Sequence, residues 1–193
     1  MVTIVLFHHI QGLTDGVVGL ADRLRTAGHE VVTPDFFDGK TFESIDEGFA
    51  YRRSSGIDVD QLADEAVADL PADVVYAGIS FGVMSAQRLA QTRPGARGAL
   101  LLEACVPVGD DGFGPWPDGV PAQIHGMDAD EFFAGEGDVH AAEEIVATVP
   151  GSELYLYPGN GHLFSDSTLP GYDAAATDLL VERALAFLAR LES

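Results

Sequence analysis

The sequence predicts an α/β fold in three layers: a mostly parallel sheet of about six strands with helices on both faces. The main observation is a regular alternation of short apolar runs with segments in which apolar residues recur at helical spacing. A second observation is the segment Gly78-Ile79-Ser80-Phe81-Gly82, which lies where the third strand should lead directly into a helix. The expected strands span residues 2–8, 30–33, 73–79, 97–103, 120–125 and 152–157.

The expected helices lie between and after these strands. Ser44-x-x-Glu47 is typical of a capping box at the start of a short helix, and Asp58-x-x-Gln61 resembles one at the start of the next. Small and apolar residues over 83–90 predict the helix that follows Ser80. The other apolar stripes consist of Val17, Leu20 and Leu24; Val59, Leu62, Ala66 and Leu70; Val139, Ala142, Ile145, Val146 and Val149; and Leu180, Ala184, Phe187, Leu188 and Leu191.

Length and charge restrict the kind of protein. The 193 residues fit one domain, spanning 1–193, that is large enough for a substantial core. The net charge of −21 predicts a surface that repels nucleic acid and anionic membranes, so we expect neither as a partner and leave the oligomeric state open. Cys105 is the one cysteine, which excludes an internal disulfide, and the N-terminal run lacks the basic region of a signal peptide. We therefore expect a cytoplasmic protein.

The segment around Ser80 has the G-x-S-x-G pattern, with a predicted strand before it and a predicted helix after it. A sharp turn from strand to helix forces its central residue into strained backbone angles and brings neighbouring backbones together, which requires glycine on both sides. Ser80 would then project at a helix N-terminus, where backbone N–H groups favour developing negative charge. This arrangement predicts a nucleophilic serine.

A serine nucleophile needs a base and an acid that orients the base. His162 lies in a tight turn after the last expected strand, at the same sheet edge as Ser80, which makes it the predicted base. Asp128, Asp130 and Glu103 are all candidates for the acid, and spacing alone does not choose among them. The order of Ser80, Asp130 and His162 along the chain is that of the nucleophile, acid and base in α/β-hydrolases.

The same chemistry needs two backbone donors for the oxyanion. One should be the N–H of Phe81, the residue after the nucleophile, and the other should come from the loop after the first strand, near residues 9–12. Residues 34–57 and 105–119 also follow strand ends, and we expect 105–119 to be an active-site loop. No histidines or acids have metal-ligand spacing, so we expect no metal and no cofactor.

These motifs together resemble the dienelactone hydrolase family, with an α/β-hydrolase fold and a serine variant of the family's nucleophile. The resemblance implies that Asp130 is the triad acid, because it precedes a short aromatic-containing turn, and that the Ile10 N–H is the second oxyanion donor. It covers almost the whole chain and rests on Phe7-His8-His9-Ile10-Gln11-Gly12, Thr33-Pro34-Asp35-Phe36-Phe37, the Ser80 segment, Asp130-x-Phe132, Tyr157-Pro158-Gly159-x-Gly161-His162-x-Phe164, Gly171-Tyr172 and Glu182-Arg183-x-Leu185-x-Phe187-Leu188.

The chain departs from the family's founding members at three positions. Ser80 replaces the cysteine nucleophile, and His9 replaces a glutamate that interacts with the resting thiol. Asp166 stands where the family holds a substrate carboxylate with arginine, so we expect it to repel an anionic substrate, although Arg52 or Arg53 could supply a positive charge. We expect the substrate pocket to be lined by His9, Phe36, Trp116, Phe164 and Asp166.

We therefore expect a serine hydrolase that cleaves a small ester or lactone through an acyl-enzyme. A thioesterase or amidase with the same three residues is one alternative. A non-catalytic small-molecule binding protein on the same scaffold is another, and reaction of Ser80 with a fluorophosphonate would distinguish it from an enzyme. A flavodoxin-like nucleotide binder is disfavoured, because the loop after the first strand is not a glycine-rich phosphate cradle.

Overall fold

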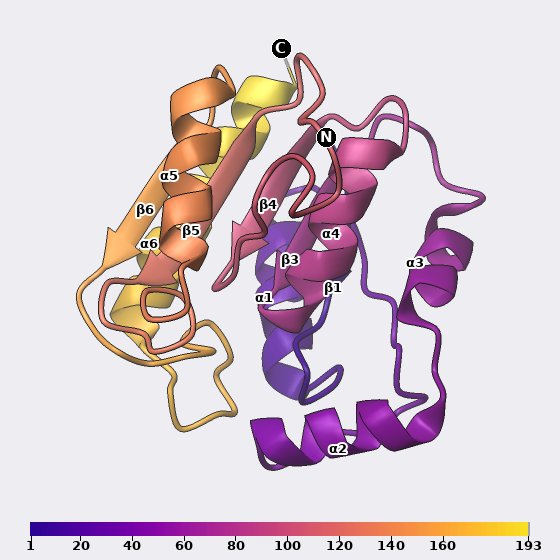
Figure 1. Cartoon of the computed structure of the whole chain (residues 1–193), viewed down its shortest axis with the longest axis vertical. Helices are drawn as coiled ribbons and strands as arrows, with labels where there is room; N and C mark the ends of the chain where they lie inside the picture. The colour runs from indigo at the N-terminus through magenta and orange to yellow at the C-terminus, as the bar shows by residue number, and fades with distance from the viewer. Residues whose placement is uncertain (193) are drawn as a thin grey trace.

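The computed structural model describes residues 1–192 and has six parallel strands in the order β2-β1-β3-β4-β5-β6 (Figure 1). The strands are β1 (Thr3–Phe7), β2 (Glu30–Val32), β3 (Val75–Ile79), β4 (Gly98–Leu102), β5 (Ala122–Met127) and β6 (Glu153–Tyr157). The helices are α1 (Asp15–Thr26), α2 (Ile45–Ser55), α3 (Val59–Val67), α4 (Phe81–Thr92), α5 (Asp138–Thr148) and α6 (Ala174–Leu191). The predicted fold class is confirmed.

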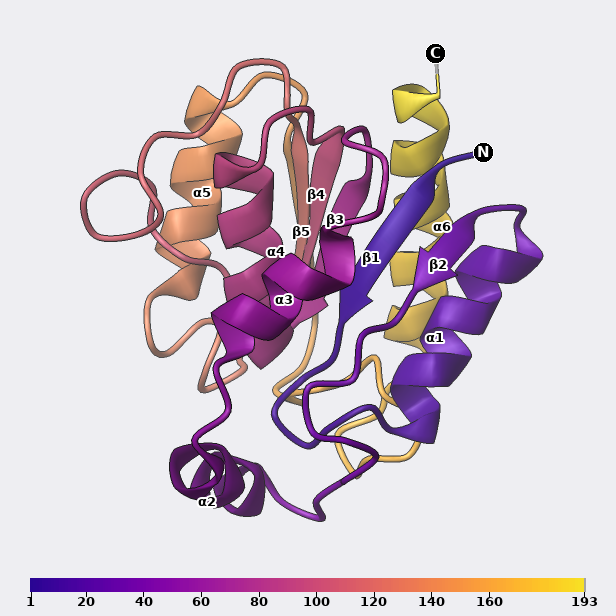
Figure 2. The same ribbon diagram turned by 90° about the vertical axis from the view of Figure 1, so that its right-hand side faces the viewer.

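Helices cover both faces of this sheet, as its strands require. In Figure 2, α1 and α6 lie on one side of the sheet, and α3, α4 and α5 lie on the other. Successive side chains of β1 point to opposite faces, so Ile4 and Leu6 pack with α1 and α6, whereas Val5 and Phe7 pack toward the second face. Both sets are almost fully buried, which explains the continuous apolar runs in the sequence.

Side chains cap the helices where the sequence predicts it. The Ser44 hydroxyl accepts a hydrogen bond from the Glu47 N–H, and the Asp58 carboxylate accepts one from the Gln61 N–H. The capping box at Ser44 is incomplete, because the Glu47 carboxylate accepts from the Glu43 N–H rather than from that of Ser44. At α1, the cap is Thr14, whose hydroxyl accepts from the Val17 N–H.

The sheet order places a topological switch between β1 and β3. The chain leaves β1 toward β2 on one side and returns to β3 on the other, so the loops after β1 and β3 diverge at the carboxyl edge of the sheet. Helix α2 crosses this edge rather than covering a face (Figure 1). Gly48 of α2 lies against the backbone of Ile10, where a Cβ atom would overlap the Ile10 carbonyl. This close approach fixes α2 above the switch point.

Among residues 1–192, no helix is both long enough and apolar enough to cross a membrane.

Candidate active site

Ser80 sits in a strained turn between β3 and α4. Its backbone has φ 49° and ψ −112°, a conformation that an L residue rarely adopts. Gly78 and Gly82 are needed on either side, because a Cβ at Gly78 would overlap the Gly82 carbonyl and one at Gly82 would overlap that of Phe7. The turn leaves the Ser80 side chain partly exposed at the edge of the sheet.

Ser80, His162 and Asp130 form a continuous hydrogen-bonded chain. Ser80 Oγ lies 2.9 Å from His162 Nε2, and His162 Nδ1 lies 2.7 Å from Asp130 Oδ2. Asp130 is buried, and its Oδ1 accepts a hydrogen bond of 3.0 Å from the Phe132 N–H. An ionised Asp130 can only accept, so His162 donates from Nδ1 and its Nε2 is free to accept the serine proton.

The other two candidate acids have different partners. Asp128 is exposed, and its Oδ1 accepts a 3.0 Å hydrogen bond from the Gly159 N–H in the turn before His162. Glu103 is fully buried and accepts from the N–H groups of Phe164 and Ser165 and, at 2.5 Å, from the Ser165 hydroxyl. Burial raises the pKa of the Glu103 carboxyl above its usual range. Both acids therefore stabilise the loop around His162 rather than contacting its imidazole.

Two backbone N–H groups near Ser80 have no acceptor within residues 1–192. They belong to Ile10, after β1, and to Phe81, the first residue of α4. Both residues also line the cavity that contains Ser80 and His162. Backbone donors without a partner beside a nucleophile are the arrangement that an oxyanion hole requires.

The cavity at Ser80 has a volume of about 290 Å³. Its lining combines apolar side chains from α2, α4 and the segment after Asp130 with three carboxylates, those of Glu103, Glu136 and Asp138. Burial raises the pKa of one of these, Asp138, above its usual range. The lining residues are Ile10, Ile45, Phe49, Ser80, Phe81, Met84, Glu103, Ala104, Phe132, Glu136, Asp138 and His162, with no lysine or arginine among them.

A larger depression, of about 670 Å³, lies near the start of α1 and contains neither Ser80 nor His162. Its lining includes Thr14 and Asp15 and offers no pair of nucleophile and base. The smaller cavity is therefore the candidate substrate pocket.

The predicted aromatic lining of this pocket is wrong. Phe36 is buried against Phe7, with ring centroids 5.5 Å apart, and Phe164 is buried with Tyr157 beneath the sheet edge. Trp116 is held away from the cavity by a 2.6 Å hydrogen bond from its Nε1 to the Val120 carbonyl. Phe36 and Phe164 point away from the cavity, and Trp116 lies near the start of β5, at the opposite edge of the sheet from Ser80.

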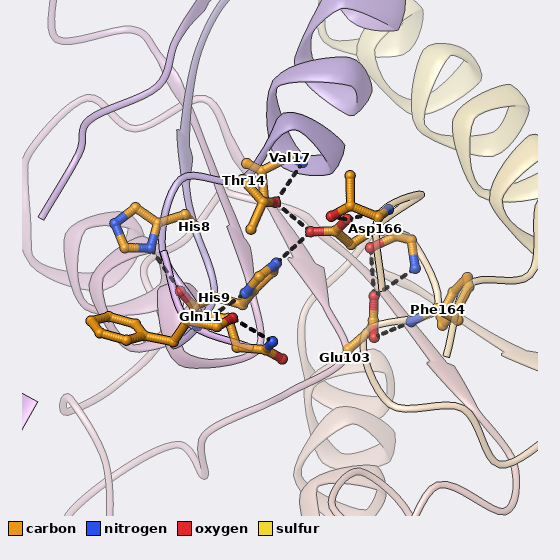
Figure 3. Close-up of polar contacts among 11 residues, drawn as sticks. His8, His9, Gln11, Thr14, Val17, Glu103, Phe164 and Asp166 are labelled. Atoms are coloured by element: carbon orange, nitrogen blue, oxygen red, sulfur yellow. Dashed lines mark hydrogen bonds and ion pairs between the residues drawn. The ribbon is translucent and has the colours of Figure 1, made fainter. Parts of the chain in front are cut away.

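The predicted pocket positions of His9 and Asp166 are also wrong. Both side chains are fully buried and bind each other, with His9 Nε2 2.8 Å from Asp166 Oδ2 (Figure 3). Although burial would raise the pKa of the Asp166 carboxyl, hydrogen bonds from His9, Thr14 and Thr168 lower it to about 2. Asp166 therefore does not face a substrate, and the expected repulsion by this residue does not hold. Arg52 and Arg53 do not line the cavity either.

Residues 105–119 do not form an active-site loop. They pack along α4, where the Gln87 side chain donates to the Val106 carbonyl at 2.7 Å and the Gln91 side chain donates to the Gly114 carbonyl at 2.7 Å. None of these residues lines the cavity at Ser80. The sequence reasoning missed Met84, Glu136 and Asp138 of the cavity lining, and also Ile45 and Phe49, whose four-residue spacing on α2 was the available signal.

No group of three or more His, Cys, Asp or Glu side chains that could hold a metal ion is found in the described part of the chain, residues 1–192. His8 and His9 leave β1 on opposite sides, His8 toward Phe36 and Phe37 and His9 toward Asp166.

Comparison with known proteins supports this architecture. Residues 118–191, which include Asp130 and His162, match the model of the dienelactone hydrolase family. No curated protein matches the sequence. A dienelactone hydrolase-like promiscuous phosphotriesterase from metagenomic libraries has a similar structure, with 18% identity and a TM-score of 0.77, over 99% of this chain and 87% of that chain. The match over residues 118–191 and the similar structures agree with the predicted resemblance to this family and its fold.

A second similar structure is esterase 2 of Thermogutta terrifontis, in a form phosphoramylated by tabun. It is 17% identical, with a TM-score of 0.67, over 98% of this chain and 83% of that chain. At this identity the two structures establish the fold, while the matched family supports a hydrolase. Ser80 lies outside the matched segment, so the evidence for its role is the geometry described above.

Proposed function

We propose that this dienelactone hydrolase-like protein is a serine hydrolase that cleaves a small ester or lactone through an acyl-enzyme. The observation that carries the proposal is the hydrogen-bonded chain from Ser80 through His162 to Asp130 at the wall of a cavity. Two backbone N–H groups without partners, at Ile10 and Phe81, line the same cavity. Together they supply each role that acyl transfer requires.

The first half of the reaction forms the acyl-enzyme. His162 Nε2 takes the Ser80 hydroxyl proton while Oγ attacks the carbonyl carbon, and Asp130 stabilises the resulting imidazolium. The Ile10 and Phe81 N–H groups donate to the oxyanion of the tetrahedral intermediate. When the intermediate collapses, the carbon–oxygen bond of the ester breaks and the leaving alkoxide takes the proton from His162.

The second half returns the enzyme to its starting state. Water attacks the acyl carbon while His162 takes its proton, and the oxyanion again lies between the same two donors. Collapse of this intermediate breaks the bond to Ser80 Oγ, which recovers its proton from His162. The products are a carboxylic acid and an alcohol, which remain one molecule when the substrate is a lactone.

The cavity supports a small substrate with an apolar part and no negative charge. Its lining includes the apolar residues Ile45, Phe49 and Met84 and the acidic residues Glu136 and Asp138. Because no lysine or arginine of residues 1–192 lines the cavity, the carboxylate of an anionic substrate would meet like charge from Glu136 and Asp138 without a cationic side chain to offset it. We therefore propose neutral esters or lactones as substrates, with charge selection by Glu136 and Asp138 rather than by Asp166.

A fluorophosphonate probe tests the nucleophile. We expect covalent labelling of the native protein at the peptide that contains Ser80 and no labelling of Ser80→Ala, with Ser167→Ala as the control for an exposed serine on a nearby loop. A turnover screen over short-chain aryl esters, lactones, thioesters and amides then identifies the leaving group. A protein that is neither labelled nor active would support the non-catalytic binding alternative. The cytoplasmic location stays a prediction.

A further inference from the structure

We infer that His9 and Asp166 are positioning residues that hold the oxyanion donor Ile10 in place relative to the base His162. The inference rests on the proposed function, because it concerns the same site. His9 immediately precedes Ile10 in the loop after β1, and Asp166 lies four residues beyond His162 in the loop after β6. Their hydrogen bond of 2.8 Å therefore joins the two loops that supply the oxyanion donor and the base.

The contacts of His9 define its protonation. His9 Nδ1 lies 3.2 Å from the backbone N of Gln11 and must accept, because that N–H can only donate. His9 Nε2 therefore carries the proton and donates it to Asp166 Oδ2. Both nitrogens of a fully buried ring are thus engaged, one with its own loop and the other with the loop of His162 (Figure 3). The ring has no free nitrogen for chemistry.

Asp166 is held as firmly as His9. Its Oδ2 also accepts from the Thr14 hydroxyl, and its Oδ1 accepts from the Thr168 N–H at 2.8 Å and the Thr168 hydroxyl at 2.6 Å. Gly16 lies so close that a Cβ there would overlap the Asp166 carboxylate. Four donors and a neighbouring helix start, at α1, stabilise a buried negative charge without an ion-pair partner.

The peptide group between His9 and Ile10 is held from its carbonyl side. The His9 carbonyl accepts from His8 Nδ1 at 2.7 Å and from the Gly12 N–H at 3.0 Å. The N–H and C=O of a trans peptide point in opposite directions, so fixing the carbonyl aims the Ile10 N–H away from these partners. With the His9 side chain anchored to Asp166, the donor cannot rotate without breaking buried hydrogen bonds.

The loop of His162 is anchored in the same buried region. Glu103, at the end of β4, accepts from the N–H groups of Phe164 and Ser165, which lie two and three residues after His162. Asp166 follows directly and connects this loop to His9 (Figure 3). The oxyanion donor and the base are thereby fixed to one polar cluster beneath the cavity, and such preorganisation is the main source of oxyanion stabilisation.

Two substitutions of His9 separate its two hydrogen bonds. The amide end of Gln reaches the position of the imidazole Nε2, so His9→Gln keeps the bond to Asp166 and loses the acceptor for Gln11. Asn reaches only the position of Nδ1, so His9→Asn keeps the Gln11 acceptor and loses Asp166. We expect His9→Asn to lower kcat at least about tenfold with KM changed by less than about twofold, and His9→Gln to stay within about threefold of native.

Binding of a trifluoromethyl ketone provides a readout that overall stability does not. Its adduct with Ser80 carries an oxyanion, so its affinity should fall in parallel with kcat in His9→Asn, while the midpoint of the pH profile of kcat/KM stays at its native value. His125→Asn and His125→Gln are matched controls. His125 is also a fully buried histidine with both nitrogens bonded, to Tyr157 and Gln123, but it lies on β5 away from the cavity. Both control variants should retain native kcat.

The outcomes separate this inference from the proposed function. A native protein that hydrolyses no ester and is not labelled at Ser80 overturns the proposed function and the inference with it. An active, labelled native protein overturns the inference alone if His9→Asn and His9→Gln turn over equally. The inference is also overturned if His9→Asn binds the trifluoromethyl ketone with native affinity, or if the His125 variants lose as much kcat as His9→Asn. Loss of kcat and ketone affinity confined to His9→Asn supports the positioning role.

Discussion

The molecule contains two histidine–aspartate pairs of nearly equal geometry that have different surroundings. The His162–Asp130 distance is 2.7 Å and the His9–Asp166 distance is 2.8 Å. His162 keeps 10% of its side chain exposed and lies at the cavity, whereas His9 is fully buried. The pairs come from the same two residue types, so the difference between them must lie in what else each residue contacts.

The second ring nitrogen decides the role of each histidine. His162 Nε2 faces the Ser80 hydroxyl, which can give up a proton, whereas His9 Nδ1 faces the backbone N–H of Gln11, which cannot. The carboxylates differ as well. Asp130 has one further donor, the Phe132 N–H, whereas three others surround Asp166. One pair can exchange a proton with a substrate, and the other can only hold its loops together.

Removing the reactive residues should have the largest effect. Ser80→Ala and His162→Ala should each lower kcat about a thousandfold or more, because each removes a partner of the proton transfer. The double variant should lose little more than either single one, since the two residues act as a unit. Turnover of an aryl ester, measured on protein whose thermal unfolding is checked in parallel, gives the comparison. Retained turnover in either single variant would contradict the mechanism.

Substituting each aspartate by asparagine separates catalysis from stability. Asp130→Asn should lower kcat about a hundredfold or more, though less than loss of Ser80, with little loss of stability. Asp166→Asn should have the smaller effect on kcat, a loss of about tenfold, and the larger effect on stability. The free energy of unfolding should fall by about 1–3 kcal/mol, because the new amide N–H₂ meets buried donors. Denaturant unfolding and kinetics on both variants measure the two effects. If both variants lost the same kcat and the same free energy of unfolding, the two histidine–aspartate pairs would not differ in function.

The sheet could be predicted well because each strand is marked by residues that are adjacent in the sequence. Strands buried on both faces appear as apolar runs, and all six expected strands are present. The site was harder to predict, because its residues are far apart in the sequence and come together only in the folded chain. Leu163 has a φ of 60°, in the loop that turns Asp166 inward toward Thr14, and no spacing rule shows this. Likewise, Ile45 and Phe49 reach the cavity only because Gly48 lets α2 pack on Ile10.

Acid should destabilise the protein through its other buried histidines. Burial lowers the pKa of His8 to about 4 and that of His125 to about 3, below the value near 6.5 of an unfolded chain. Below pH 6.5 the unfolded state binds protons that the folded state excludes, so stability is complete above this pH and falls as pH decreases toward the folded values. At pH 5 each histidine should lower the free energy of unfolding by about 2 kcal/mol relative to its value above pH 6.5.

His125→Gln isolates one of these contributions. Glutamine does not titrate, so this variant, although less stable at pH 7, should lose about 2 kcal/mol less than the native protein between pH 7 and pH 5. Urea unfolding of both proteins at the two pH values measures the difference. The same loss in both would mean that His125 is protonated in the folded state, and that burial does not distinguish it from an exposed histidine.

The smallest effect concerns the acidic residues that line the cavity at Ser80. Glu136 is exposed at the cavity and Asp138 is half-buried there. A carboxylate about 8 Å from an anionic substrate group, at an effective dielectric near 40, repels it by about 1 kcal/mol. Glu136→Gln should therefore raise kcat/KM for an anionic ester, relative to a matched neutral ester, by about fivefold. Added salt should reduce the gain, because the charge is exposed.

Glu144→Gln makes the same change at an exposed position of α5 outside the cavity lining and should leave the ratio unchanged. An equal gain in both variants would show that the net charge of −21, rather than the cavity, selects the substrate.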